Sequence, residues 1–255
     1  MREILFRCSS IGKLMTEPKT KSEGPLSVGA KTHIREVLAQ DIFGVQFEIS
    51  ERKLEKGIEV EPESLALLNR VRGLKLVRNA ERRKNEWITG EADIFDAAPR
   101  IGHDLKSAWS VATMPICVED IAGSQRALYE WQMRGYMMLW DAEEWHVDYC
   151  LVDTPERLIG YEPLTMHVVS HIPEHLRVTS WVIKRDRAAE LAIIKKVKHA
   201  RAYYAQALAE FDASHPDLQQ RAAHEPPPWS ETTAPAPQTA PAGTAPAELA
   251  LDPFA

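Results

Sequence analysis

Gly90-Glu-Ala-Asp93-Ile-Phe-Asp96 and Gly102-His-Asp104-Leu-Lys106-Ser107 hold the strongest structural signal in this chain. In and around both segments, apolar and polar residues tend to alternate, which predicts neighbouring β-strands over 87–96 and 101–109. The residues between them, Ala97-Ala-Pro-Arg100, have the composition of a turn. We therefore expect two adjoining strands joined by a short connection.

Acidic residues and a lysine gather in these two strands. Residues two apart in a strand point to the same face, so Asp104 and Lys106 project together, and Asp93 can face them if the strands pair. With Glu61 added from a helix packed on the sheet, the pocket is rich in oxygen and suits Mg²⁺ or Mn²⁺, as one or two ions. The backbone carbonyl of Leu105 is a further ligand candidate. Such a pocket can hydrolyse a phosphodiester, with Lys106 orienting the water or helping to take its proton.

Composition sets the class of protein. The 255 residues are 44% hydrophobic and 27% charged, enough for one sizeable core in one or at most two domains. A net charge of -6 argues against binding of nucleic acid by bulk electrostatics, but an enzyme that works through bound cations needs only local basic patches. The three cysteines lie far apart and predict no disulfide, zinc or iron-sulfur site. With no apolar run long enough for a bilayer, we expect no membrane contact and a cytoplasmic location.

The remaining segments predict an α/β fold, with a central mixed sheet of four or five strands flanked by helices. Ser9 or Ser10 and Ser27 are candidate N-caps of the first two helices, and Asp186 of the last. Expected helices run from the Ser9 or Ser10 cap through Met15 and over 27–43, 51–71, 124–141 and 186–211, and further strands cover 145–152, 161–170 and 177–183. Composition turns to Ala, Pro and Thr near Glu225. We expect a folded domain over 1–213 and a disordered tail over 214–255, whose apolar end is either a docking peptide or inert.

The order of four motifs is more specific than any one of them. Gly57-x-x-x-Glu61, Gly90-x-x-Asp93, Asp104-Leu-Lys106 and Gln132-x-x-x-Tyr136 follow one another along the chain. From about Phe6 to Pro155 the chain resembles the PD-(D/E)XK nucleases, in the lambda-exonuclease-like branch that includes YqaJ-type phage recombinases. The resemblance implies a restriction-endonuclease-like core.

The same resemblance implies roles for the motif residues. Glu61, Asp93 and the Asp104-x-Lys106 pair would bind the metals, with Gln132 and Tyr136 beside them on the next helix. The opening Arg7-Cys-Ser-Ser10 is similar to the segment that meets a 5′-terminal phosphate, which places Arg7 and Ser10 there. One departure is Asp104, where lambda-like members usually carry glutamate.

The implied activity is Mg²⁺-dependent 5′-to-3′ digestion of linear double-stranded DNA. It would leave a 3′ strand for a single-strand annealing recombinase or a single-strand binding protein, and the resemblance also suggests a homotrimer. Two alternatives stay open: a structure-specific or single-strand endonuclease with the same site, and a catalytically silent DNA-binding protein. Gln132 and Tyr136 are also compatible with an ordinary polar pair on a helix that buries Tyr129 and Trp131. Strand alternation points His103 away from Asp104.

Overall fold

The computed structural model describes residues 4–47, 51–121 and 123–215, and all of them belong to one compact unit, Met1–Gln220. This part of the chain contains a four-stranded sheet and a smaller three-stranded sheet. The predicted tail lies outside the described residues from position 216 onwards. None of the described helices is both long and apolar enough to cross a membrane.

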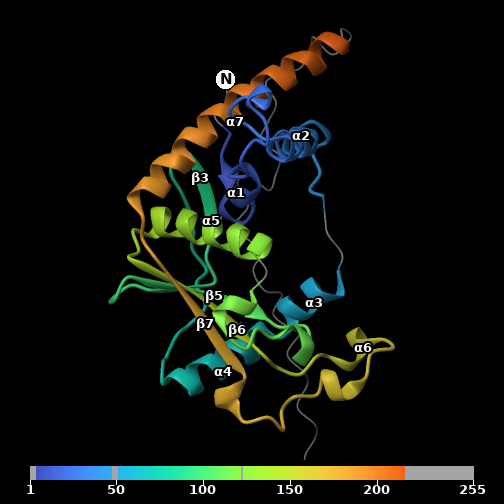
Figure 1. The fold of residues 1–255 in the computed structure, drawn as a ribbon, viewed down its shortest axis with the longest axis vertical. Coiled ribbons are helices and arrows are strands. Elements are labelled where there is room, and N and C mark those ends of the chain that lie inside the picture. Colours follow the sequence, from blue (N-terminus) through green and yellow to red (C-terminus); the bar gives the residue numbers. More distant parts are fainter. Residues whose placement is uncertain (1–3, 48–50, 122, 216–255) are drawn as a thin grey trace, which may run out of the picture. The chain divides into compact units, whose positions relative to one another are not determined.

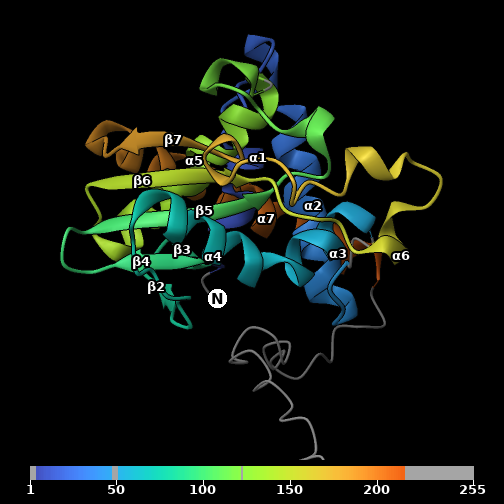
Figure 2. The same cartoon turned by 90° about the horizontal axis from the view of Figure 1, so that it is seen from below.

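The four-stranded sheet has the order β4-β5-β6-β7. Its strands are β4 (Ile94–Asp96), β5 (Ile101–Ser107), β6 (Glu144–Cys150) and β7 (Val178–Lys184). Strands β4 and β5 form the expected antiparallel hairpin, β5 and β6 are parallel, and β7 is antiparallel to β6. The sheet is therefore mixed, and the order of its strands is visible in Figure 2.

Helices cover both faces of this sheet, as the α/β prediction required. Helix α5 (Gly123–Trp140) crosses one face and buries Met133 and Met137 against Trp145 and Val147 of β6 (Figure 1). Helix α4 (Glu61–Arg72) covers the other face, where Leu67 and Leu68 join Ile94, Cys150 and Val178 in a second apolar cluster. Burial of these two apolar layers is the main stabilising contribution to the sheet.

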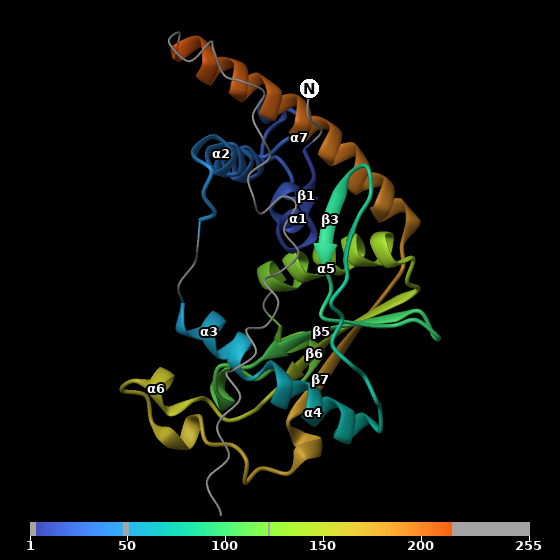
Figure 3. The same ribbon diagram turned by 180° about the vertical axis from the view of Figure 1, so that it is seen from behind.

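The smaller sheet was not predicted. Its order is β1-β3-β2, with β1 (Phe6–Arg7), β2 (Arg82–Lys84) and β3 (Ile88–Glu91). The expected strand over 87–96 is in fact two strands, β3 in this sheet and β4 in the other, separated at Ala92 and Asp93. Figure 3 shows β1 and β3 next to α1 (Cys8–Leu14).

Two glycines allow α1, β3 and α5 to pack closely. A Cβ atom at Gly90 would lie 2.8 Å from Tyr136 and 2.9 Å from Cys8, and one at Gly135 would lie 3.0 Å from the Cys8 sulfur. The glycine inside the α5 helix thus marks a close approach of the helix to its neighbours, which offsets its low helix propensity. This contact brings the N-terminal strand beside the central elements of the fold.

Several helix boundaries follow from caps. Helix α2 (Val28–Phe43) begins as predicted, with the Ser27 side chain accepting from Ala30 N. Helix α7 (Arg187–Ser214) begins with Asp186 accepting from Ala188 N. The proposed serine cap of the first helix is wrong: α1 already begins at Cys8, and the Ser10 hydroxyl donates to Arg7 O instead.

The helix expected over 51–71 is two helices, α3 (Arg52–Glu59) and α4. The break falls at Val60 because Pro62, which has no N–H to donate, favours the first turn of a new helix. Gly57 therefore lies on α3 and Glu61 begins α4, so the predicted single helix over 51–71 is wrong.

The strand expected over 161–170 is also wrong. The segment instead contains a short 3-10 turn at Leu164–Met166; α6 (Glu156–Ile159) precedes it, and another 3-10 turn at Glu174–Leu176 follows. Further 3-10 turns occupy Lys21–Glu23, Val111–Thr113 and Val118–Asp120.

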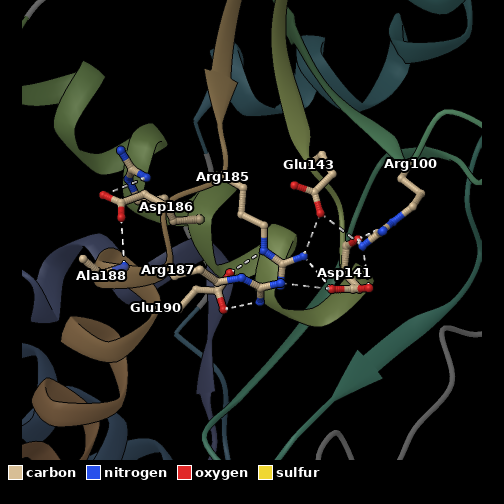
Figure 4. A network of polar contacts seen from close by, with 9 residues as sticks. Arg100, Asp141, Glu143, Arg185, Asp186, Arg187, Ala188 and Glu190 are labelled. Atoms are coloured by element: carbon tan, nitrogen blue, oxygen red, sulfur yellow. Dashed lines mark hydrogen bonds and ion pairs between the residues drawn. The ribbon is translucent and has the colours of Figure 1, made fainter.

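A network of ion pairs joins the far ends of the central elements (Figure 4). Arg100, in the turn of the β4–β5 hairpin, pairs with Asp141 just beyond α5, and Arg185 pairs with the same carboxylate at 2.5 Å. Arg185 also contacts Glu190 in the first turn of α7 at 2.7 Å. Both Arg100 and Asp141 have positive φ angles, so the network holds two tight turns in place.

Candidate active site

The β4–β5 hairpin brings three of the predicted residues together. Asp93 directly precedes β4, and Asp104 and Lys106 lie in β5. Lys106 Nζ lies 2.5 Å from Asp104 Oδ2, and Leu105 N donates to Asp93 Oδ2 at 2.9 Å. As predicted from the alternation of side chains in a strand, Asp104 and Lys106 share a face. Asp93 contacts this strand from the position just before β4.

Glu61 joins this group from the start of α4. Its carboxylate contacts Arg78 Nε at 3.1 Å, and its side chain is 20% exposed. Burial raises the pKa of Glu61, Arg78 lowers it, and the charges of Asp93 and Lys106 also act on it. We call Glu61, Asp93, Asp104 and Lys106 the carboxylate–lysine cluster.

Gln132 and Tyr136 lie beside the cluster on α5. Gln132 Nε2 is 3.4 Å from Asp104 Oδ1 and 3.2 Å from Tyr136 Oη. One helical turn separates the two residues, so both reach the same face of the helix. Gln132 thus contacts Asp104 and Tyr136 contacts Gln132, so the two residues are not a polar pair unconnected with the cluster.

Electrostatics in the cluster are dominated by crowded negative charge. Burial, and then the neighbouring Asp104 carboxylate, raise the pKa of Asp93 to about 6, against the opposing effect of Lys106. Burial also raises the pKa of Asp104, which is 1% exposed. Burial works against the charge of Lys106, but Asp104 and Asp93 outweigh it and raise the pKa of this lysine. Lys106 is accordingly a fixed positive charge in this state of the site.

Two aromatic residues that were not predicted to belong to the site lie next to Lys106. The Tyr129 ring centroid lies 4.8 Å from Lys106 Nζ, so Tyr129 is a neighbour of the cluster and not a member of the buried far side of α5. Tyr149 is the partner of Lys106 in the β5–β6 register and is also buried on this face. The signal for Tyr129 was available, since it precedes Gln132 by three residues in a helix.

Arg7 and Ser10 occupy the junction of β1 and α1. Arg7 pairs with Thr89 of β3, four residues before Asp93 in the chain. Partial burial and the nearby charge of Arg82 both lower the pKa of Arg7. Two guanidinium groups thus lie on the smaller sheet, on the two strands that flank β3, the strand that leads to Asp93.

The donors of the cluster fit a hard divalent cation. Three carboxylates converge, and burial and mutual repulsion raise the pKa values of Asp93 and Asp104, so a cation placed between them would favour their ionised forms. Oxygen donors of this kind are preferred by Mg²⁺ and Mn²⁺.

Comparison with known proteins gives independent information. A phage-related exonuclease from Haemophilus somnus 129PT is 34% identical in sequence and superposes with a TM-score of 0.77, over 82% of this chain and 97% of that one. An alkaline exonuclease from Laribacter hongkongensis is 16% identical with a TM-score of 0.58, over 84% and 94%, which shows the shared fold. The same Laribacter enzyme in complex with dAMP gives 17% identity and a TM-score of 0.55. No protein-family model and no curated protein matches the chain.

The order of motifs, the hairpin that joins the aspartates to the lysine and the extended similarity to the Haemophilus enzyme point the same way. The chain belongs to the lambda-exonuclease-like, phage-related branch of the PD-(D/E)XK nucleases, and it is a nuclease.

Proposed function

We propose that this nuclease is a divalent-cation-dependent exonuclease that digests linear double-stranded DNA from 5′ to 3′. The observation that carries the proposal is the carboxylate–lysine cluster, in which Asp93, Asp104 and Lys106 converge on one face of the hairpin. The direction of digestion rests on family resemblance and on the position of Arg7 and Ser10.

In this proposal the acidic residues hold the cation. Asp93 and Asp104 would be direct ligands, with the Leu105 carbonyl and Glu61 completing the set. Bound Mg²⁺ or Mn²⁺, as one or two ions, would supply an activated water and neutralise charge on the phosphate oxygens. Gln132, which donates to Asp104, keeps that carboxylate oriented.

Lys106 would act in catalysis through its positive charge. In the metal-free site the carboxylates raise the pKa of Lys106, so the group beside them is an ammonium. A positioned ammonium can hold the attacking water and stabilise the negative charge that develops on the phosphate during the reaction. This role differs from general-base catalysis, which would require a lowered pKa.

Arg7 and Ser10 would bind the 5′-terminal phosphate. Burial, and then the charge of the nearby Arg82 guanidinium, lower the pKa of Arg7, and a dianionic phosphate would favour the charged form of both groups. Digestion from that end would leave a 3′ single strand. A single-strand annealing recombinase or a single-strand binding protein is therefore the proposed partner, and a homotrimer the proposed assembly.

A digestion series tests these statements. Linear duplexes with a 5′-phosphate, linear duplexes with a 5′-hydroxyl and closed circles are incubated with the enzyme and Mg²⁺, with and without chelator. We expect fast loss of the phosphorylated linear duplex, slower loss of the hydroxyl form, intact circles and no reaction with chelator. An Arg7→Ala variant should lose the preference for the phosphate.

The outcomes separate the alternatives. Equal cutting of circles would favour the endonuclease, and binding without cleavage under all conditions would favour the silent DNA-binding protein. Equal rates on the two linear duplexes would remove Arg7 and Ser10 from the proposal but leave the metal-dependent chemistry standing.

A further inference from the structure

The reverse face of β5 and β6 carries a second group of potential ligands. His103 and His146 are partners in the register of the two parallel strands, and Asp148 follows His146 by two residues. Because side chains alternate along a strand, these three project away from Asp104 and Lys106. They lie on the face that α4 covers, and the carboxylate–lysine cluster does not use them.

The three side chains are close together and largely buried. One ring nitrogen of each histidine and one oxygen of Asp148 all lie within 4.8 Å of one another. His103 Nδ1 is 2.7 Å from Asp148 Oδ2, and the two imidazole rings are 4.8 Å apart in an edge-to-face arrangement. His103 is 4% exposed and Asp148 is 1% exposed.

Neighbouring residues hold this group in position. The Ser180 hydroxyl donates to Asp148 Oδ1, so the carboxylate that contacts His103 is itself oriented. Carboxylates that bind metals are commonly held by hydrogen bonds of this kind.

The surroundings of His146 indicate that a ligand can bind here. Its Nε2 atom is buried and has no hydrogen-bond partner among the described residues, and a carboxylate oxygen of Glu144 lies 3.5 Å away. A buried polar atom without a partner is costly, by about 1–3 kcal/mol. A cation between the imidazoles and the carboxylate would satisfy it.

We propose that His103, His146 and Asp148 bind a divalent transition-metal ion of the Zn²⁺ class. Two imidazoles and a carboxylate are the donors that Zn²⁺ prefers, whereas the all-oxygen cluster on the opposite face suits Mg²⁺ or Mn²⁺. Glu144 or water would complete four-coordination. The two faces of the same strands would thus hold metals of different chemistry, and this inference does not depend on the proposed function.

Binding requires a small adjustment. Ligand atoms of a tetrahedral Zn²⁺ lie about 3.3 Å apart. His103 Nδ1 and Asp148 Oδ2, now 2.7 Å apart, must therefore separate, the atoms that lie as far as 4.8 Å apart must approach, and the His103 proton moves to its other ring nitrogen. Two cations belong to the same neighbourhood: Arg72 donates to Ser180, and Lys184 lies 4.0 Å from Glu144. Their charges weaken cation binding, so we expect micromolar affinity.

Zinc titration of the full-length, untagged chain tests the site. The Asp93→Asn variant is used as the background, in excess Mg²⁺, to suppress zinc binding at the carboxylate–lysine cluster. Calorimetry and competition with a chromogenic chelator should give one Zn²⁺ per chain. Adding His146→Gln or His103→Gln should weaken binding at least tenfold, whereas His171→Gln, a change at an exposed histidine outside the group, should leave it unaltered.

Anomalous scattering at the zinc edge, from crystals of the unaltered chain grown with Zn²⁺, decides the matter without any substitution. A peak between His103, His146 and Asp148 would support the site. A peak only at the carboxylate–lysine cluster, no peak, or unchanged affinity in folded His146→Gln and His103→Gln proteins would overturn it.

Discussion

Two lysines reach into this fold and meet opposite surroundings. Lys106 on β5 faces the Asp104 carboxylate and the Tyr129 ring. Lys56 on α3 is 1% exposed and donates to three backbone carbonyls, Ala108 O at 2.6 Å, Trp109 O at 3.1 Å and Val152 O at 3.0 Å.

The two ammonium groups differ in pKa for a clear reason. Carboxylates carry a full negative charge and raise the pKa of Lys106 despite its burial. At Lys56 burial prevails and lowers the pKa to about 8, against a smaller opposing effect of Asp153. Carbonyl dipoles satisfy the hydrogen bonds of a buried ammonium without cancelling its desolvation. Lys56 therefore ties α3 to the ends of β5 and β6, while Lys106 is available for chemistry.

The largest expected effect is on Lys106. We expect Lys106→Ala to lower the rate of DNA cleavage by about 10³-fold, because the charge that stabilises the transition state is lost. Lys106→Arg should also be strongly impaired, since the wider guanidinium does not fit the position of a compact ammonium. Steady-state cleavage of a linear duplex is the measurement, and Lys75→Ala, at an exposed lysine, is the control. Cleavage by Lys106→Ala at the unaltered rate would remove Lys106 from the mechanism.

Lys56 should matter for stability instead. We expect Lys56→Met to lower the free energy of unfolding by about 2–4 kcal/mol, because three buried carbonyl oxygens lose their donor. Urea denaturation measures this, and activity per folded molecule should stay within a few-fold of normal. Lys53→Met, at an exposed position on the same helix, should be neutral. If the two variants are equally stable, the assigned role of Lys56 is wrong.

The ionised Asp93 side chain should lower the stability of the metal-free protein, because it is buried beside the Asp104 carboxylate. Its folded-state pKa of about 6 is above the ordinary value of 3.8, so in the absence of metal this group lowers stability as pH rises from about 4 to 6, and the loss is complete above 6. Asp93→Asn removes the charge and keeps an oxygen for Leu105 N. We expect it to raise the free energy of unfolding above pH 6 by about 1–3 kcal/mol, while abolishing cleavage.

Urea denaturation in chelator at pH 4.5, 6 and 8 tests this prediction. The gain should be small at pH 4.5 and full at pH 8. A gain independent of pH, or a loss of stability at pH 8, would contradict the electrostatic explanation.

Tyr129 should have the smallest effect. A cation–π contact is worth about 0.5–1 kcal/mol at a partly exposed site, so Tyr129→Leu should slow cleavage roughly two- to fivefold. Tyr129→Phe keeps the ring and should be close to normal. Tyr161→Leu, at an exposed tyrosine, serves as the matched control. A loss in Tyr129→Phe as large as in Tyr129→Leu would show that the hydroxyl, not the ring, matters.

The predictions about the site that agree with the structure came from the repeat of side-chain directions along strands and helices. Asp104 and Lys106 share a face because a strand repeats every two residues, and Gln132 and Tyr136 share a face because a helix turn spans about four. The pairing of β4 with β5 was predictable from the turn between them. The α/β fold class is confirmed on the same basis. The metal-binding and catalytic roles of these residues stay predictions.

The predictions from sequence failed where residues far apart in the chain determine the secondary structure. The segment 161–170 has strand-like composition, but it contains Pro163 and forms a 3-10 turn at Leu164–Met166. The expected strand over 87–96 divides between two sheets, since β3 pairs with the N-terminal β1 and with β2. The proline signal at Pro62 was present in the sequence, and the break it caused between α3 and α4 could have been foreseen.

The sequence by itself determined the hairpin, the helix caps at Ser27 and Asp186 and the order of acidic residues and lysine, because these depend on neighbours within a few positions. Only the tertiary structure decided that Glu61 joins the cluster, that Lys56 is buried among carbonyls and that His103 meets His146 and Asp148. Those arrangements depend on which elements pack together, and packing is determined by the whole apolar core and not by any local pattern.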